Sequence, residues 1–314
     1  MKHLVLLPEP IHPDGIAVLA KDMDVLVLDT VEDPTFAEML PHADGVVVRS
    51  IPFGPALVDQ GQRLKVIGRH GAGLDNIDVA YAGRRGITVV NTPHSNTVSV
   101  AEYVITAILM LAKRMGELSA ALADGRFAES DGSLPGQVTR HGLIGREIAG
   151  MQLGIVGFGA IGRAVAARAQ ALGMAVDAHD PYVTAGEFAS LDVTRVDSLG
   201  ELLERSDVLT VHVPGGQGAL IGRDEIRRMR PGALLINTAR GDVVDPEALV
   251  DAVNDGHLAG AVVDVFQPEP PDPRSPLLHT PGILCTPHMA AMTREALRRM
   301  AIDVAHAVRK VLCP

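Results

Sequence analysis

Short aliphatic runs recur along the chain, and most are separated by segments in which apolar residues return every three or four positions. Aliphatic runs that alternate with helix-like segments are typical of parallel strands buried on both faces by crossover helices. The expected strands are residues 4–7, 25–28, 46–48, 66–67, 88–90, 153–156, 175–178, 208–213, 234–236, 261–263 and 283–284. The pattern therefore predicts a doubly wound α/β fold with parallel sheets.

The alternation of strands and helices breaks once, after the fifth expected strand. Residues 96–124 are predicted to form a long helical stretch, and residues 125–150 a Gly-rich, irregular piece. A last helical segment, 292–312, has no strand after it and can pack back on the first domain. Because 314 residues suit two domains, we expect a discontinuous domain of residues 1–95 plus 290–314 and an inserted domain of residues 96–289.

Composition and charge narrow the range of partners. The chain has a formal net charge of -10, no Trp and only 3% aromatic residues. A phosphate backbone or an anionic membrane would repel such a chain, and few side chains are available for stacking on bases. We therefore expect no nucleic-acid or membrane partner, and any bound anion must meet local arginines.

The same composition indicates a cytoplasmic protein. The apolar run near the N-terminus is broken by prolines and is too short for the apolar region of a signal peptide. Cys285 and Cys313 are too few for a disulfide framework, which fits a reducing compartment. The longest apolar stretch, residues 98–112, contains Glu102 and is short for a membrane span.

The strongest local motif follows the strand expected at 153–156. Gly157, Gly159 and Gly162 form the pattern Gly-x-Gly-x-x-Gly, and the helical residues 163–171 come next. The first glycine permits the tight turn, the second lets the backbone approach a pyrophosphate, and the third allows close packing of helix and strand. A plain Gly-rich turn is the alternative when the pattern stands alone.

An acidic residue after the next strand strengthens the dinucleotide interpretation. Asp180 lies 18 residues after Gly162, just beyond the strand expected at 175–178. A carboxylate there accepts hydrogen bonds from both ribose hydroxyls and repels a 2′-phosphate, which favours NAD over NADP. The alternative is a turn-forming Asp before Pro181.

Three residues that follow later strands suit hydride transfer at a 2-hydroxy acid, because ligands bind beyond the carboxyl ends of strands in open α/β sheets. His288 is the predicted acid and base, since imidazole exchanges protons near neutral pH. Glu269 is its predicted partner, because a carboxylate orients the ring and stabilises imidazolium. Arg240 is predicted to bind the substrate carboxylate and polarise the carbonyl.

Each of these three residues also has a structural interpretation. His288 could be a hydrogen-bonded loop histidine, Glu269 a solvated loop acid, and Arg240 a helix cap or a surface cation. All three at successive strand ends are harder to explain in that way.

Together these motifs resemble the D-2-hydroxyacid dehydrogenase family, especially its 3-phosphoglycerate dehydrogenase-like branch. The resemblance covers almost the whole chain. It rests on residues 71–78, 91–93, 99–102, 157–162, 237–241, 264–270 and 286–288. It implies a Rossmann-type NAD domain inserted in a flavodoxin-like substrate domain, a catalytic set on Arg240, Glu269 and His288, an active site between the domains, no metal, and a homodimer formed largely through the NAD domain.

The resemblance also implies which residues contact NAD. Ala160 and Ile161 offer backbone amides to the pyrophosphate, and Asp264 holds the nicotinamide carboxamide, with a strand-end cap as its alternative role. The other expected cofactor contacts are His212, Val213 and Pro214 on the adenine side, and Thr238 and Ala239 before Arg240.

Substrate contacts are expected in the first domain. The loop Arg69-His70-Gly71-Ala72-Gly73 resembles the family's substrate loop, whose main-chain amides hold the substrate carboxylate. Arg49, followed by Ser50, and Arg69 match positions at which phosphoglycerate-type enzymes present cations to the far end of the substrate. The expected substrate is therefore a small 2-hydroxy or 2-oxo acid with an anionic tail: 3-phosphoglycerate, glycerate or hydroxypyruvate, or sulfolactate. The alternatives are plain turn glycines and arginines in structural salt bridges.

The chain departs from the family pattern in two places. Gly215-Gly216-Gln217-Gly218 follows Pro214 where the family has Leu-Thr, so the adenine-side loop is expected to be looser. Residues 128–141 make a longer link than usual, and a lid, a dimer arm and a simple loop all stay open for it. No C-terminal regulatory domain is expected after the last helix.

A different function class uses the same fold, namely NAD-sensing corepressors that act through protein partners. The complete Arg, Glu and His set favours the enzyme over this alternative.

Overall fold

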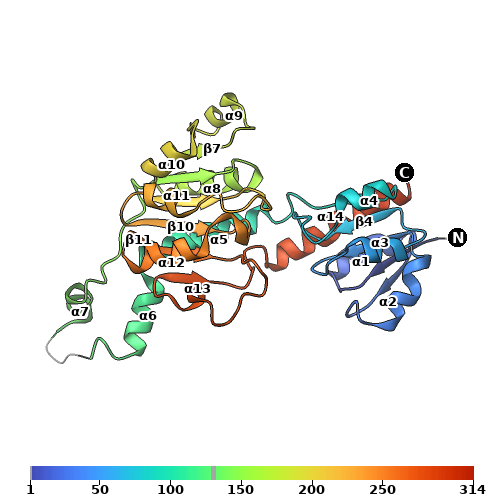
Figure 1. The fold of residues 1–314 in the computed structure, drawn as a ribbon, viewed down its shortest axis with the longest axis horizontal. Helices are drawn as coiled ribbons and strands as arrows, with labels where there is room; N and C mark the ends of the chain where they lie inside the picture. The colour runs from blue at the N-terminus through green and yellow to red at the C-terminus, as the bar shows by residue number, and fades with distance from the viewer. Residues whose placement is uncertain (1, 129–131) are drawn as a thin grey trace. The chain divides into compact units, whose positions relative to one another are not determined.

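The computed structural model describes residues 2–128 and 132–314, which divide into two compact units (Figure 1). Unit 1 comprises Met1–Ser99 together with Ala291–Pro314, and unit 2 comprises Val100–Ala290. Each unit is built on one sheet in which all strand pairs are parallel. The predicted doubly wound parallel α/β fold is confirmed.

Unit 1 contains a five-stranded sheet in the order β2-β1-β3-β4-β5. Its strands are β1 (His3–Leu7), β2 (Met23–Val27), β3 (Gly45–Val48), β4 (Val66–Arg69) and β5 (Thr88–Val90). Its helices are α1 (Pro13–Ala20), α2 (Pro34–Met39), η1 (Leu40–His42), α3 (Pro55–Gln60), α4 (Val79–Arg84) and α14 (Arg294–Leu312). Two clusters of buried aliphatic side chains cover the two faces of the sheet, as parallel strands require.

The return helix α14 completes the core of unit 1. It packs against α1 and β4, and its buried side chains join Val5, Leu7 and Val66 in one cluster. Glycines allow this close approach: a Cβ at Gly68 would lie 2.7 Å from Val308 Cγ2, and a Cβ at Gly15 would lie 2.5 Å from the carbonyl oxygen of Ala301.

Unit 2 contains a seven-stranded sheet in the order β12-β11-β10-β9-β6-β7-β8. Its strands are β6 (Gln152–Val156), β7 (Ala175–His179), β8 (Thr194–Arg195), β9 (Val208–Val211), β10 (Ala233–Asn237), β11 (Leu258–Val263) and β12 (Ile283–Cys285). Its helices are α5 (Thr97–Ala112, largely in this unit), α6 (Met115–Ala123), α7 (Leu134–Arg140), α8 (Ala160–Ala171), α9 (Ala185–Ala189), α10 (Leu199–Arg205), α11 (Arg223–Arg228), η2 (Gly241–Val243), α12 (Pro246–Asn254) and α13 (Pro276–His279). The strand order reverses between β6 and β9, and ligands bind at the carboxyl ends of strands beside such a switch point.

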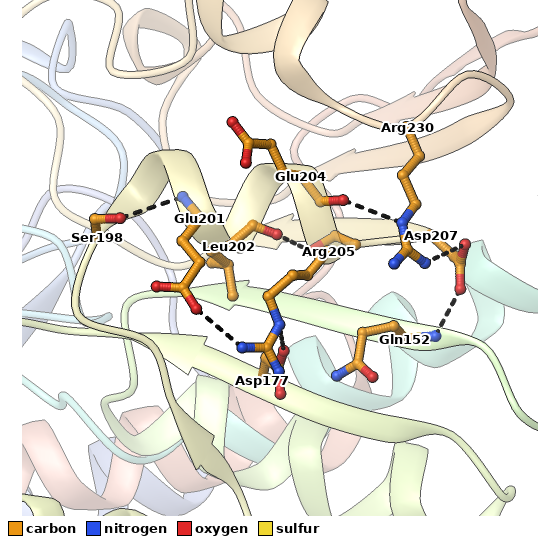
Figure 2. A network of polar contacts seen from close by, with 10 residues as sticks. Gln152, Asp177, Ser198, Glu201, Leu202, Glu204, Arg205, Asp207 and Arg230 are labelled. Atoms are coloured by element: carbon orange, nitrogen blue, oxygen red, sulfur yellow. Dashed lines mark hydrogen bonds and ion pairs between the residues drawn. The ribbon is translucent and has the colours of Figure 1, made fainter.

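The amino ends of the central strands are tied by polar contacts (Figure 2). Asp207 accepts a hydrogen bond of 2.9 Å from the backbone N–H of Gln152 and pairs with Arg230 at 3.1 Å. Asp177, only 2% exposed in β7, pairs with Arg205 of α10 at 2.8 Å. These contacts fix α10 and the strand ends opposite to the edge that carries the predicted site.

Three elements differ from the sequence-based expectations. The helical stretch expected at 96–124 is divided into two helices, α5 and α6, at Arg114, which adopts a left-handed conformation with φ of 52°. The segment expected to be irregular contains α7. Ser133 caps the N-terminus of this helix, because its side chain accepts the backbone N–H of Gly136. The two-residue edge strand β8 was missed. Residues 129–131, part of the link at 128–141, lie outside the described residues.

Among the residues that the structure describes, no helix is both long enough and apolar enough to cross a lipid bilayer. In the same part of the chain, no group of three or more His, Cys, Asp or Glu side chains is placed to hold a metal ion.

Candidate active site

The glycine turn between β6 and α8 leaves open space where it faces away from the protein. Gly157 has φ of 91°, and a Cβ there would lie 2.6 Å from the carbonyl oxygen of His212. A Cβ at Gly162 would lie 2.4 Å from the carbonyl oxygen of Gly157, so this glycine allows the helix to approach the strand. A Cβ at Gly159 would meet nothing within 4 Å, which is the expected property of a glycine that makes room for a ligand.

The turn is held in place by an aromatic and cationic stack. Phe158 is fully buried and stacks on Phe188 with ring centroids 4.6 Å apart. Arg163 donates to the carbonyl oxygen of Phe158 at 3.0 Å, and its guanidinium lies over the Phe158 ring. Glu187 pairs with Arg163 at 2.8 Å, and this hydrogen bond, with those from Thr184, lowers the pKa of Glu187 to about 2. The first turn of α8, with Ala160 and Ile161, is therefore rigidly placed.

Asp180 lies at the carboxyl end of β7 and reaches the glycine turn. Its Oδ2 accepts the backbone N–H of Phe158 at 2.8 Å, and its Oδ1 accepts the backbone N–H of Tyr182 at 2.9 Å. Each carboxylate oxygen keeps a lone pair after one hydrogen bond. Asp180 can therefore organise the turn and also accept hydrogen bonds from a ribose.

The segment after β9 runs beside the loop that carries Arg240. Burial lowers the pKa of His212 to about 4, so its ring is neutral, and Nε2 lies 3.1 Å from Thr210 Oγ1. Val213 and Pro214 follow His212 at the carboxyl end of the strand. A Cβ at Gly215 would lie 2.3 Å from Asp242 Oδ1 and 2.8 Å from Arg240 Cβ, so the loop packs tightly against Arg240. The expectation of a looser loop is not supported at Gly215.

The turn after β10 presents Thr238, Ala239 and Arg240. Asn237 braces it, because its Oδ1 accepts the backbone N–H of Ala239 at 3.0 Å and its Nδ2 donates to the carbonyl oxygen of Arg240 at 2.9 Å. Thr238 Oγ1 is buried and has no hydrogen-bond partner in the described chain. A buried hydroxyl without a partner is costly, which suggests a ligand contact at this position.

The loops that carry Arg240 and Glu269 are in direct contact. A Cβ at Gly241 would lie 2.0 Å from the carbonyl carbon of Phe266, so only glycine allows this approach. Glu269 then folds back on the same loop, and its Oε1 accepts the backbone N–H of Phe266 at 2.9 Å.

Glu269 and His288, two of the predicted catalytic residues, are in direct contact. Glu269 Oε2 lies 2.9 Å from His288 Nδ1, and the side chains are 39% and 53% exposed. With Nδ1 donating to the carboxylate, Nε2 is the ring nitrogen left to exchange a proton. A cavity of about 360 Å³ adjoins the pair, and Phe266, Leu278 and Cys285 are among its lining residues. Burial raises the pKa of Cys285 to about 11, so this thiol stays protonated.

The backbone of His288 is held by Asp264. His288 has φ of 51°, a left-handed conformation that is unusual for a residue with a side chain. Fully buried Asp264 accepts the backbone N–H groups of Met289 and Ala290, each at 2.8 Å, and the hydroxyl of Thr286 at 2.6 Å. These three bonds match the strand-end cap that was the alternative for Asp264. Its contact with a nicotinamide carboxamide stays a prediction.

In unit 1, the predicted substrate loop follows β4. His70 is 3% exposed, its Nε2 lies 3.3 Å from the carbonyl oxygen of Leu297, and burial lowers its pKa to about 4. The loop is tied to the next strand, because Asn91 Nδ2 donates to the carbonyl oxygen of Ala72 at 2.7 Å. In the described chain, the backbone N–H groups of Ala72 and Gly73 donate to no protein acceptor. They are therefore available to an anion.

The two predicted tail-binding arginines differ in their surroundings. Arg69 donates from Nε to Asn76 Oδ1 at 3.0 Å and from Nη1 to the carbonyl oxygen of His70. Arg49 lies in the turn after β3, and its Nη2 lies 3.7 Å from the sulfur of Met292. Among residues 2–128 and 132–314, no carboxylate pairs with the guanidinium of Arg49.

Comparison with known proteins decides the family. The family described as "D-isomer specific 2-hydroxyacid dehydrogenase, NAD binding domain" matches residues 105–290, which is more than half of the chain. The chain belongs to the D-isomer specific 2-hydroxyacid dehydrogenase family. The predicted family is thereby confirmed, and so is NAD as the cofactor of the matched domain.

Two curated members of the family illustrate its range. The chain is 40% identical to an (S)-sulfolactate dehydrogenase of Chromohalobacter salexigens, with 98% of each chain covered. It is 36% identical to a D-3-phosphoglycerate dehydrogenase of Methanocaldococcus jannaschii, where the match covers 98% of this chain but only 57% of the relative. The chain thus spans little more than half the length of that phosphoglycerate dehydrogenase.

Solved structures similar to this chain agree with the fold. The TT0316 protein from Thermus thermophilus superposes with a TM-score of 0.86 at 33% identity, covering 98% of this chain and 96% of that one. D-lactate dehydrogenase from Aquifex aeolicus, solved with NAD and lactic acid, superposes with a TM-score of 0.82 at 28% identity, covering 98% and 94%.

Three features of unit 2 are suited to a dinucleotide, and its contacts with the predicted residues stay a prediction. The open side of Gly159, the N-terminus of the 12-residue helix α8 and the unpartnered hydroxyl of Thr238 are the features that an NAD molecule would satisfy. Asp180 lies just after β7, and its contact with the ribose stays a prediction.

Sequence reasoning missed the residues that hold the predicted site residues in place. Tyr103 contacts the Thr286 hydroxyl that donates to Asp264, and Glu9 accepts backbone N–H groups from the turn that carries Arg49. Their chemistry is ordinary, and their partners are far away in the sequence, so no local pattern could reveal them.

Proposed function

We propose that this protein is an NAD-dependent oxidoreductase that interconverts a small D-type 2-hydroxy acid and the corresponding 2-oxo acid, and that its substrate has an anionic tail. The proposal rests on the pair of Glu269 and His288, in which Oε2 lies 2.9 Å from Nδ1. The pair lies at the carboxyl edge of the sheet that also bears the glycine turn. This pair supplies a positioned proton donor and acceptor beside a dinucleotide site.

NADH, held by the glycine turn at Gly157–Gly162 and by Asp180, would supply the hydride for the 2-oxo carbon. In this direction His288 donates a proton from Nε2 to the carbonyl oxygen, and Glu269 stabilises the imidazolium before transfer. Arg240 binds the substrate carboxylate and polarises the carbonyl. The products are the 2-hydroxy acid and NAD, and solvent returns the proton to the ring.

An anionic tail is supported by the surroundings of Arg49 and by the relatives. In a chain of net charge -10, the guanidinium of Arg49 has no acidic partner in the described residues, which leaves it available to a substrate anion. One relative, matched over 98% of both lengths, is an (S)-sulfolactate dehydrogenase, so sulfolactate is the first candidate. The other candidate with an anionic tail is 3-phosphoglycerate. Glycerate or hydroxypyruvate, whose tails are neutral, would instead mean that Arg49 binds no substrate tail.

A panel of 2-oxo acids assayed by the loss of NADH absorbance tests this function. We expect turnover of 3-sulfopyruvate or 3-phosphohydroxypyruvate to exceed that of pyruvate. His288→Ala should lower the rate of reduction by about 10²- to 10⁴-fold while NADH binding, followed by its fluorescence, persists. His279→Ala, at an exposed histidine of α13, is the control and should retain the rate.

Two outcomes would contradict the proposal. Binding of NADH without turnover of any 2-oxo acid would favour the NAD-sensing binding protein. Equal rates in His288→Ala and the wild type would remove His288 from the reaction.

A further inference from the structure

A carboxylate from the first strand-end loop lies at the centre of the turn that carries Arg49. Glu9 Oε2 accepts the backbone N–H groups of Arg49, Ser50 and Ile51 at 3.0, 2.8 and 3.2 Å. Its Oε1 accepts the hydroxyl of Ser50. Three consecutive amides directed at one oxygen form an anion-binding concavity, and here a side chain of the same unit fills it.

The charge state of Glu9 fits this arrangement. Burial alone would raise the pKa of Glu9, but hydrogen bonds from the Ser50 hydroxyl and from the backbone N–H groups of Ser50, Ile51 and Arg49 bring it below the usual value. The side chain is therefore an anion at neutral pH, and bonds between amides and a charged acceptor are stronger than neutral ones.

Asn76 also holds this turn. Its Nδ2 donates to the carbonyl oxygen of Ile51 at 2.7 Å, and its Oδ1 accepts Arg69 Nε at 3.0 Å. Phe53 donates its backbone N–H to the carbonyl oxygen of Asn76 at 2.6 Å. Glu9 and Asn76 thus both hold the turn, and Asn76 also joins it to Arg69.

Glu9 binds the turn without neutralising its cation. Its oxygens are directed at main-chain amides and the Ser50 hydroxyl, whereas the Arg49 guanidinium extends to the sulfur of Met292. The 49–51 turn gains a rigid backbone while Arg49 keeps its charge for another anion. A guanidinium held on a fixed backbone loses less conformational entropy on binding than one on a mobile turn.

We infer that Glu9 is a positioning residue for the substrate tail: by fixing the backbone of residues 49–51 it sets Arg49 for an anionic group, and so it controls the preference for anionic over neutral 2-oxo acids. The inference rests on the proposed function, because it requires that Arg49 binds the tail. Glu9 itself contacts neither the reacting carbon nor the tail.

The test compares KM and kcat for substrates with charged and neutral tails. Glu9→Ala should raise KM for 3-sulfopyruvate or 3-phosphohydroxypyruvate by about three- to tenfold, while kcat and the KM for pyruvate change little, because only the preorganisation of Arg49 is lost. Glu9→Gln keeps the shape and one accepting oxygen, and we expect it to restore part of the discrimination. Thermal unfolding of each variant shows whether the chain remains folded, and Glu9→Gln decides the matter if Glu9→Ala does not.

Asp33→Ala is the matched control. Asp33 is also a carboxylate of unit 1 that accepts a backbone N–H, that of Thr35 at 2.8 Å, but it caps α2 rather than the turn at Arg49. It should lower stability without changing the discrimination between tails.

Two failures are distinguishable in this experiment. Arg49→Ala should raise KM for anionic substrates by about 10- to 100-fold, because a charged hydrogen bond is lost. If KM does not rise, the proposed tail binding is wrong. If Arg49→Ala has that effect but both Glu9 variants discriminate between tails as well as Asp33→Ala does, the role of Glu9 is overturned.

Discussion

At the scale of single residues, the candidate catalytic histidine depends on a buried carboxylate that need not touch substrate. His288 has φ of 51°, a conformation that costs of the order of 1 kcal/mol for a residue with a Cβ. Asp264 compensates by accepting the two following backbone N–H groups. The geometry of the proton donor is therefore set by the main chain around it as well as by Glu269.

The rate of reduction tests the partnership of Glu269 with His288. In Glu269→Gln the ring loses the negative charge beside Nδ1, so an imidazolium that donates its proton to the substrate is less stabilised. The rate of NADH oxidation at saturating 2-oxo acid should fall by about 10- to 100-fold. An unchanged rate would exclude Glu269 from the mechanism.

Buried His70 should make folding sensitive to mild acid. Its pKa is about 4 in the folded protein against 6.5 for the free side chain, since burial disfavours the charged ring. The unfolded chain therefore binds a proton first, and the free energy of unfolding should decrease by up to about 3 kcal/mol as pH drops from about 6.5 through about 4. Denaturant unfolding at several pH values should show a shallower decrease for His70→Gln than for the exposed-site control His279→Gln. Parallel curves would contradict this account.

Site residues whose own side-chain chemistry is needed for the reaction were predictable from the sequence. Glu269 and His288 were expected as a pair, and the structure brings their side chains to 2.9 Å. Glu9 was not predictable, because a glutamate after a strand is unremarkable until the fold places it beside a turn about 40 residues later. Hydrogen bonds to main-chain amides leave no sequence pattern.

At the scale of elements, helix packing in unit 1 depends on the absence of a side chain at Gly15. A Cβ there would lie 2.5 Å from the carbonyl oxygen of Ala301, a backbone atom that cannot rotate away. Gly15→Ala should therefore destabilise the unit by about 1–3 kcal/mol through overpacking between α1 and α14. Gly83→Ala is the control, since a Cβ at this position in α4 meets nothing within 4 Å.

The two glycine variants should shift stability in opposite directions. Alanine favours a helix over glycine by about 1 kcal/mol, so Gly83→Ala should be neutral or stabilising. Denaturant midpoints of both variants against the wild type give the answer. An equal midpoint for Gly15→Ala and the wild type would show that α14 can move aside.

Long buried strands were predictable from aliphatic runs, whereas boundaries set by distant contacts were not. The break between α5 and α6 falls at Arg114, which donates to the carbonyl oxygen of Gly142 and pairs with Glu117. The first of these contacts exists only in the folded chain. Similarly, β8 has two exposed residues and is defined by its pairing with β7 alone.

At the scale of the whole molecule, the segment of α6 and α7 is the best candidate for contact with a second copy. Figure 1 shows both helices projecting away from the sheet of unit 2. Four large apolar side chains of this segment are exposed by 53–61%, and they are Met115, Leu122, Leu134 and Ile144. A homodimer is expected from the family resemblance and stays a prediction, and the apolar groups exposed on this segment are candidates for its contact.

Replacing two of these residues by charged ones tests the dimer. Leu122→Glu together with Ile144→Glu should shift the protein to monomers, because a homodimer places both new charges in an apolar contact. Light scattering after size exclusion measures the mass directly. Leu172→Glu, at an exposed leucine after α8, is the control and should leave the mass unchanged. A wild type that is already monomeric would end the proposal.

The dependence of unit 1 on α14 has a consequence for synthesis on the ribosome. Val5, Leu7 and Val66 emerge early, but the helix that covers them comes from Arg294–Leu312, after all of unit 2 has been made. Unit 2 can therefore acquire its core first. Until α14 has been made, the face of the unit 1 sheet that this helix covers stays exposed to solvent and can aggregate. A nascent chain stalled before α14 should bind general chaperones through that face and release them once the last helix has been translated.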